Sequence, residues 1–317
     1  MILLCGIPSE TPMRLVRDRL DALGAVYAVF NQRHFADCEL QFEVSRGEVG
    51  GRLKLGTSVH SLRDFRAIYT RLMDDRSLPE LAGESTDSPK HKYCRSFHDT
   101  LNHWMEFSPA LVINRYVPMG SNASKPYQAQ LIRAQGFKVP ETLITSDPER
   151  VREFQAIHGR VIYKSLSSIR SIVQTLGPSD LDRLESIRWC PTQFQAYVEG
   201  TNIRVHVIRD RIYPTAIETE ATDYRYARRQ AGKAADLREV KLCDELAERC
   251  VELAKSMGLV FAGIDLKVTP DNQVYCFEVN PSPAFSFYEN HTGQPISQGI
   301  AAGLVEADAD TRLSAAA

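Results

Sequence analysis

The chain has 317 residues, of which 43% are hydrophobic and 25% charged, a composition typical of a globular protein of about two domains. The net charge of −2 excludes a global field for nucleic acid or an anionic membrane, and no apolar run reaches the ~20 residues of a transmembrane helix. The seven cysteines are scattered and lack C-x-x-C spacing, which favours reduced thiols over a zinc site.

The first third of the chain opens with a β-α-β pattern. MILLCGI (1–7) is typical of a buried strand, residues 12–24 alternate at helical spacing up to Gly24, and AVYAVF (25–30) predicts a second strand. The opening residues lack a basic segment before a long apolar one, so we expect a cytoplasmic protein. Residues 76–92 are polar and rich in Ser, Pro and Gly, which predicts a long surface loop that only connects two elements or also covers a substrate.

A lysine stands at the start of the next predicted helix, SKPYQAQLIRAQG (124–136). Pro126 suits the first helical position and Gly136 the C-terminal stop, which places Lys125 at the N-cap. A lysine beside the positive end of a helix dipole is unfavourable, so a bound anion would stabilise it. The alternative is an ordinary solvated lysine.

Two further basic residues lie on predicted strands. RVIYKS (160–165) carries Lys164 into the serine-rich turn SLSSIRS, and FQAYV (194–198) follows. Residues 201–218 predict a hairpin in which Arg204 and His206 share one face, opposite Ile203, Val205 and Val207. The pattern of residues 240–258 predicts an amphipathic helix that ends at Gly258.

The stretch FAGIDLKVTPDNQVYCFEVNPSP (261–283) predicts a second hairpin with acidic residues inside its strands. With Asp271 and Asn272 as a two-residue loop, Ile264 faces Val279, Leu266 faces Phe277 and Val268 faces Tyr275 on an apolar face. The other face then pairs Gly263 with Asn280, Asp265 with Glu278, and Lys267 with Cys276.

Opposed carboxylates repel each other unless a cation lies between them. Asp265, Glu278 and Asn280 offer only oxygen ligands, as magnesium or manganese prefers. The alternative is a solvated sheet face on which Lys267 or another base neutralises Asp265. If the acids repel, a neutral amide at either position leaves the metal-free stability unchanged or raises it.

Taken in chain order, Lys125, Lys164, FQAYV, NIRVHV, GIDLKV and FEVNP resemble an ATP-grasp ligase of the RimK-like type, over about residues 114–304. Within this type the chain is similar to the branch that includes the graspetide (microviridin-type) peptide ligases. That similarity rests on SKPYQAQLIRAQGFKVPETLIT, on the tripeptide Asp223–Arg225 and on ENHTGQPISQGIAAGL.

The resemblance implies an α/β (α+β) fold with a two-lobe ATP-grasp unit. An N-terminal α/β domain (1–115) would precede the two lobes, 116–194 and 195–317. The backbone of the connecting strand, Gln195, Ala196, Tyr197 and Val198, would hold adenine. Lys125 and Lys164 would bind the phosphates and Arg204 the transferred phosphoryl group, with Arg204 and Lys164 as the catalytic pair. The acidic hairpin would hold magnesium, with manganese possible, through Asp265, Glu278 and Asn280.

The implied reaction phosphorylates a substrate carboxylate with ATP, after which an amine or hydroxyl attacks the acyl phosphate. Three features differ from the usual pattern: Asn202 replaces an aspartate, the phosphate-covering turn has serines and Arg170 in place of glycines, and SPAFSFYE follows the last motif. A peptide and a small-molecule substrate both stay open, as does a homodimer. A nucleotide-binding regulator without turnover and an α/β interaction protein without a nucleotide are the alternatives to an enzyme.

Overall fold

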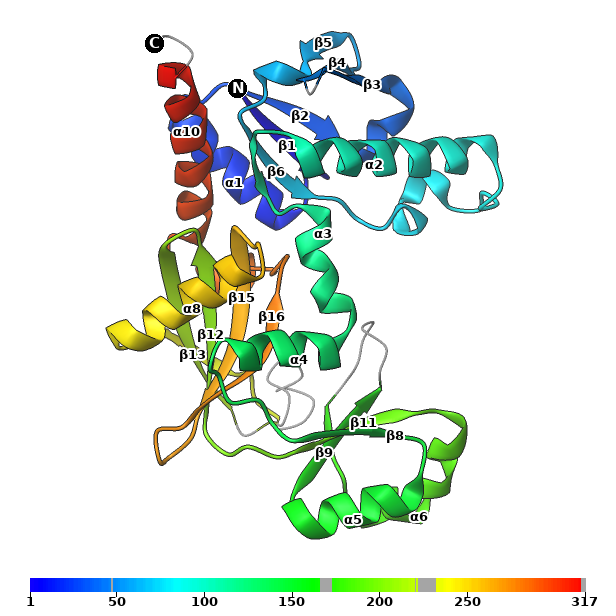
Figure 1. Cartoon of the computed structure of the whole chain (residues 1–317), viewed down its shortest axis with the longest axis vertical. Helices are drawn as coiled ribbons and strands as arrows, with labels where there is room; N and C mark the ends of the chain where they lie inside the picture. Colours follow the sequence, from blue (N-terminus) through cyan, green and yellow to red (C-terminus); the bar gives the residue numbers. More distant parts are fainter. Residues whose placement is uncertain (47, 166–172, 220, 222–231, 315–317) are drawn as a thin grey trace.

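The computed structural model describes residues 1–46, 48–165, 173–219, 221 and 232–314. This part of the chain forms three tiers along the long axis of the molecule (Figure 1): an N-terminal sheet near both termini, a large sheet in the middle, and a distal sheet at the far end. The combination of parallel and antiparallel sheets with helices confirms the α/β (α+β) class. Arg170 and the tripeptide 223–225 lie outside the described residues. Within the described ranges, no helix has the length and apolar character needed to cross a membrane.

The N-terminal sheet is parallel and has helices on both faces. Its elements are β1 (Ile2–Gly6), α1 (Thr11–Ala22), β2 (Tyr27–Asn31), β6 (Ala67–Arg71), α2 (Pro89–Phe107), β7 (Leu111–Ile113) and α10 (Ile296–Ser314), with the strand order β2-β1-β6-β7. Alternation along β1 separates the faces: Ile2 and Leu4 share a core with α1 and α10, whereas Leu3 and Cys5 share one with α2. The predicted β-α-β start is therefore confirmed, and the last helix completes the core that the first strand begins.

The surface loop predicted at 76–92 is confirmed for residues 82–88 and wrong at both ends. The segment overlaps two short 3-10 turns, η3 (Asp75–Ser77) and η4 (Pro79–Leu81), and its last four residues begin α2. Leu78 and Leu81 are buried in the same core as α2. The sequence did not predict the burial of these two leucines, because the average composition of the segment is polar. Beside this core lies a small antiparallel sheet with the order β3-β4-β5, made of β3 (Cys38–Ser45), β4 (Glu48–Leu55) and β5 (Ser58–Ser61).

The distal sheet is antiparallel with the order β10-β9-β11-β8. Its elements are β8 (Thr142–Thr145), α5 (Pro148–His158), β9 (Val161–Ser165), β10 (Gln174–Thr175), α6 (Pro178–Asp182), η6 (Leu184–Trp189) and β11 (Thr192–Ala196). Val151, Val161 and Phe194 form its core with neighbouring leucines. Lys164 of β9 is the register partner of Gln193 of β11, so both side chains lie on the same face.

The large sheet is antiparallel with the order β14-β13-β12-β15-β16. Its elements are β12 (Thr201–Ile208), β13 (Arg211–Glu218), β14 (Asp236–Glu239), α8 (Asp244–Ser256), β15 (Phe261–Val268), β16 (Val274–Asn280) and α9 (Ser286–Thr292), and α3 (Tyr116–Met119), η5 (Gly120–Ala123) and α4 (Lys125–Ala134) lead into it. As predicted, Ile203, Val205 and Val207 pack into one core with α8 and α4. Arg204 and His206 therefore lie on the opposite face.

Helix α4 begins one residue earlier than predicted. Ser124 is its N-cap, with φ −129° and ψ 98°, and Lys125 is the first helical residue. Gly136 ends the helix as predicted, because its φ of +77° is a conformation that glycine adopts without strain. Gln128, one turn after Lys125, donates to Val279 O at 2.8 Å and accepts from Val279 N at 3.1 Å. These bonds hold α4 against β16.

The acidic hairpin differs from the predicted register over half of its length. Thr269 N donates to Gln273 O, so the loop has three residues, and Asn272 takes φ +61°. A β-bulge between Asp265 and Leu266 then makes Leu266 pair with Cys276, Lys267 with Tyr275 and Val268 with Val274. The longer turn and the bulge shift the register in opposite directions and cancel. The pairs Ile264–Val279, Asp265–Glu278 and Gly263–Asn280 are therefore as predicted, whereas Cys276 is in the core and Phe277 is not.

Candidate active site

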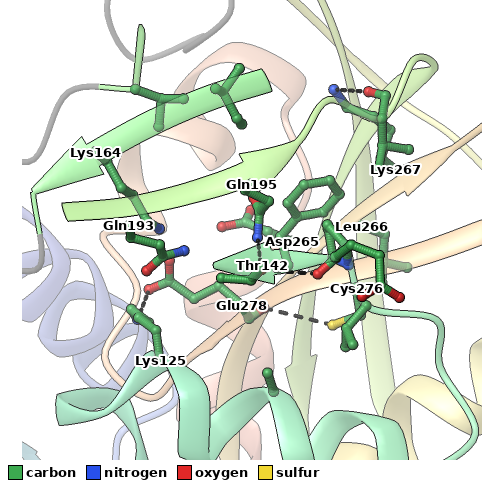
Figure 2. Close-up of a pocket in the computed structure, with 18 of the residues that line it drawn as sticks. Lys125, Thr142, Lys164, Gln193, Gln195, Asp265, Leu266, Lys267, Cys276 and Glu278 are labelled. Carbon is green, nitrogen blue, oxygen red and sulfur yellow. Dashed lines mark hydrogen bonds and ion pairs between the residues drawn. The ribbon is translucent and has the colours of Figure 1, made fainter. Parts of the chain in front are cut away.

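A cavity of about 450 Å³ lies between the distal sheet and the large sheet, with α4 along one side. Figure 2 shows its side chains converging from β9, β11, β15, β16 and α4. The predicted site residues that line it are Lys125, Lys164, Gln195, Tyr197, Val198, Arg204, Asp265, Glu278 and Asn280. Ala196 of β11 does not line the cavity. Its backbone N–H donates to the carbonyl oxygen of Glu141, the residue before β8, at 2.9 Å.

Lys125 and Glu278 form an ion pair in the cavity wall. Nζ of Lys125 donates to Oε1 of Glu278 and to Oδ1 of Asn122, each at 2.7 Å, and the Lys125 and Glu278 side chains are 25% and 29% exposed. Burial raises the pKa of the Glu278 carboxyl, but the nearby cations, Lys125 first and then Arg204 and Lys164, outweigh it and lower the pKa overall. Lys125 is thus not a solvated surface lysine.

Arg204 neutralises the second acid of the hairpin. Because β12 pairs with β15, Arg204 lies directly opposite Asp265, and its Nη1 is 3.0 Å from Oδ1 of Asp265 and 2.9 Å from the carbonyl oxygen of Gly263. The Arg204 side chain is 8% exposed. The base that satisfies Asp265 is therefore Arg204 and not Lys267. Since each acid has its own cation, the expectation that a neutral amide leaves the metal-free stability unchanged or raises it no longer holds.

The two carboxylates and the Asn280 carboxamide would offer oxygen atoms as metal ligands. Asn280 Oδ1 accepts from Ser282 N at 2.9 Å, which orients the carboxamide. Across the described ranges, no group of three or more His, Cys, Asp or Glu side chains is arranged to hold a metal ion. A cation here would take its remaining ligands from water or from phosphate oxygens, as magnesium does in nucleotide sites. The donor set fits a hard divalent ion bound together with a nucleotide.

Comparisons with known proteins agree with this geometry. The model of the RimK-like ATP-grasp domain matches residues 123–304, which is more than half of the chain and includes every residue of the cavity described in this subsection except Asn122. The chain belongs to the RimK-like ATP-grasp family. It is an ATP-grasp ligase, and its reaction class is the ATP-dependent joining of a carboxylate to an amine.

Relatives and solved structures extend the similarity of this ATP-grasp chain beyond the matched domain. A probable alpha-L-glutamate ligase of Vibrio cholerae is 26% identical over 74% of this chain and 80% of its own length. The ATP-grasp ligase PsnB, solved with a precursor variant, Mg and ADP, is 26% identical, covers 96% of this chain and 98% of its own, and has a TM-score of 0.76. The macrocyclase MdnC of Microcystis aeruginosa, solved with precursor peptide MdnA, is 23% identical, covers 96% and 99%, has a TM-score of 0.78 and shares the fold.

At the end of the ATP-grasp cavity beside Val198, two residues lie that the sequence did not predict as site residues, Lys267 and Phe277. Lys267 donates from Nζ to Val198 O at 3.0 Å and lies over the rings of Tyr197 and Phe277, at 5.1 and 5.7 Å from their centroids. Burial, and then Arg160, lower the pKa of the Lys267 ammonium. The signal for Lys267 was its alternation with Asp265, two residues earlier on the same face. Phe277 could not be found from the pattern, because only the bulge turns it toward the cavity.

Lys164 enters the ATP-grasp cavity from the distal sheet. In Figure 2, Lys125 lies below the Glu278 side chain and Lys164 lies above it, beside Gln193. The attraction between Lys164 and Glu278 is strong enough to contribute to the lowered pKa of that carboxyl. Of the serine-rich turn after Lys164, only Ser165 is within the described residues.

His206 lies behind Arg204 on the same face of β12 and is fully buried. Its ring packs edge-on against Tyr288 at 4.8 Å and stacks on Phe261 at 6.3 Å. Neither ring nitrogen has a hydrogen-bond partner among the described residues. Burial, with a smaller effect of Arg204, holds the pKa of His206 well below its usual value, so the ring is neutral near pH 7.

Proposed function

We propose that the cavity binds ATP with its base between Gln195 and Val198 and its phosphates between Lys125, Lys164 and Arg204. Residues 116–194 and 195–317 would act as the two lobes around the nucleotide. The single observation that supports these roles is the convergence of the three cations and the two acids on one cavity between two sheets. Phosphoryl transfer needs such positioned charges more than it needs a nucleophilic side chain.

Asp265, Glu278 and Asn280 would hold magnesium, with manganese as a second choice. The ion would supply positive charge beside the phosphates. Lys125 and Arg204, which pair with Glu278 and Asp265 in this structure, would bind phosphate oxygens when those carboxylates serve as metal ligands. Arg204 and Lys164 would stabilise the charge that develops on the phosphoryl group as a substrate carboxylate oxygen attacks it and ADP leaves.

The product is formed in a second step. An amine attacks the acyl carbon of the acyl phosphate, the bond to phosphate breaks, and the amine loses its proton. We propose a peptide as the substrate class, because the ATP-grasp ligase PsnB, which is similar to 96% of this chain, was solved with a precursor variant bound. A free amino acid is the second candidate, and the relative named as a probable glutamate ligase favours it.

ATP with magnesium is expected to stabilise the protein, because a ligand that binds only the folded state adds about 2.7 kcal/mol at a hundredfold excess over its Kd. The melting temperature is measured with ATP and magnesium, with ATP and EDTA, and with neither. ADP release is then measured with peptides and with single amino acids as acceptors. A melting temperature that does not respond to millimolar ATP and magnesium contradicts the proposal, and stabilisation without ADP release favours a regulatory protein.

A further inference from the structure

The carboxyl edge of the N-terminal sheet faces the large sheet. In the order β2-β1-β6-β7, the chain leaves β1 toward β2 on one side while β6 lies on the other. The crevice between the carboxyl ends of β1 and β6 is thus a topological switch point, where open α/β sheets commonly bind ligands. Gly6 and Arg71 are the register partners at these two ends. A Cβ at Gly6 would lie 2.9 Å from the Arg71 carbonyl oxygen, so glycine permits this close approach.

Arg71 reaches across this crevice to the large sheet. Its Nε and Nη2 donate to the Glu10 carboxylate, the shortest distance being 2.7 Å, and its Nη1 donates to Ser282 Oγ at 3.2 Å and to Pro283 O at 3.3 Å. The Arg71 side chain is 10% exposed. Every nitrogen of its guanidinium therefore donates to a protein acceptor, and the role that this geometry supports is to hold a segment in place.

Asn114, which follows β7 on the same edge, holds the same segment. Its Nδ2 donates to Pro281 O and to Phe261 O, each at 2.6 Å, and its Oδ1 accepts from Phe261 N at 3.0 Å. Asn114 is buried. The N-terminal sheet thus contacts each of the residues 281, 282 and 283.

The segment held in this way borders the proposed metal and phosphate groups. Ser282 N donates to Asn280 Oδ1 at 2.9 Å. On its other side, a Cβ built at Gly263 would lie 2.9 Å from Pro283 Cβ and 3.1 Å from Arg204 Nη1, so Pro283 and Arg204 both lie close to that glycine. A displacement of residues 281–283 would therefore turn the Asn280 carboxamide and alter the packing around Arg204.

We propose that Arg71, fixed by Glu10, is a positioning residue for Asn280, so that the N-terminal sheet sets the geometry of the metal site. The inference rests on the proposed metal and nucleotide site. A group that orients a metal ligand commonly changes metal affinity or activity by about 10–100-fold when it is removed. A merely structural ion pair would lower the stability and leave the magnesium requirement unchanged.

The test measures the magnesium concentration that gives half of the ATP-dependent rise in melting temperature. Arg71→Met is expected to raise this concentration about 10-fold or more, and Arg71→Lys to raise it less, because lysine keeps the charge but not the fork of donors. Ser282→Ala removes only the hydroxyl contact and serves if Arg71→Met does not fold. The matched control is Arg33→Met, whose guanidinium is paired at 2.6 Å with Glu80 in the same domain; it should leave the magnesium requirement unchanged.

A second measurement combines Arg71→Met with Asn280→Ala. If Arg71 acts through Asn280, the two changes together raise the magnesium requirement by clearly less than the product of their separate effects. Independent effects, or an Arg71→Met requirement equal to that of Arg33→Met, overturn the inference while the proposed function stands. If the melting temperature of the wild-type protein does not respond to ATP and magnesium, the proposed function is overturned, and this inference with it.

Discussion

Lys125 and Glu278 are 153 residues apart in the sequence, and their side chains meet at 2.7 Å in the cavity wall. Gln128 makes this possible, since its paired hydrogen bonds to Val279 fix the first turn of α4 next to Glu278. Lys125 is thereby placed where it can exchange a protein carboxylate for a phosphate oxygen.

Lys125→Met should weaken ATP binding far more than it weakens the fold. The pair with Glu278 is partly solvated, so its loss should lower the free energy of unfolding by about 1 kcal/mol or less. Nucleotide affinity should fall about 10-fold or more, because a charged hydrogen bond to phosphate is lost. Both are measured by denaturant unfolding and by ATP titration with magnesium.

The control is Lys138→Met, which removes a lysine that lies 6.0 Å over the Tyr275 ring and does not line the cavity. Equal ATP affinity in the Lys125 and Lys138 variants would show that Lys125 has only a structural role.

Asp265→Asn should lower the stability of the metal-free protein. The change leaves the buried Arg204 guanidinium without its carboxylate, at a cost of about 1–3 kcal/mol. Glu278→Gln should cost less, since the base that it leaves unpaired, Lys125, is 25% exposed whereas Arg204 is 8% exposed. Both variants should lose the stabilisation by ATP and magnesium, which melting curves with and without the ligands measure.

Glu218→Gln is the matched control for these acids, because Glu218 pairs with Arg238 at 2.9 Å on the exposed part of the same sheet. Acid variants that keep the wild-type response to ATP and magnesium would refute the metal site.

His206 should make the protein less stable in mild acid. Its pKa is lowered in the folded state by burial and then by Arg204, so its contribution is complete above the unfolded pKa of about 6.5. Below that pH, protonation favours the unfolded state, and the loss reaches at most about 1.4 kcal/mol per pH unit. The free energy of unfolding is measured from pH 8 to pH 5.

His206→Phe replaces the ring with one that does not titrate and suits the neighbours Phe261 and Tyr288. Below pH 6.5, the free energy of unfolding of this variant should fall less steeply with decreasing pH than that of the wild type. The remaining pH dependence includes His98, because burial also lowers the pKa of that residue. Identical slopes in wild type and variant would show that His206 does not titrate as proposed.

Lys267→Met should raise the KM for ATP about 10-fold with little change in kcat. Its ammonium holds Val198 O at the end of the cavity proposed for the base, and a hydrogen bond to a charged group contributes about 1.5–3 kcal/mol. Steady-state ADP release measures both constants. Lys255→Met, which removes an exposed lysine paired with Glu252 on α8, is the control; a fall in kcat with KM unchanged would contradict this role for Lys267.

The sequence by itself determined the local structure and the order of the motifs. Alternation predicted the β-α-β start and the faces of β12, because these depend on neighbours in one strand or helix. The opposition of Asp265 and Glu278 was also predicted, but it holds only because the bulge compensates for the longer turn. The order of the motifs was enough to identify the ATP-grasp family before any contact was known.

Only the tertiary structure decided which charges meet. The partner of Asp265 depends on the pairing of β12 with β15, and that of Glu278 on the packing of α4 against β16. Periodicity carries no information about either, since each joins segments far apart in the chain. The bulge beside Phe277 was hidden for a different reason: it lies within one hairpin, but alternation along a single strand does not show an extra residue, which appears only in the register of both strands. The hold of Arg71 on Ser282 likewise required two sheets to meet.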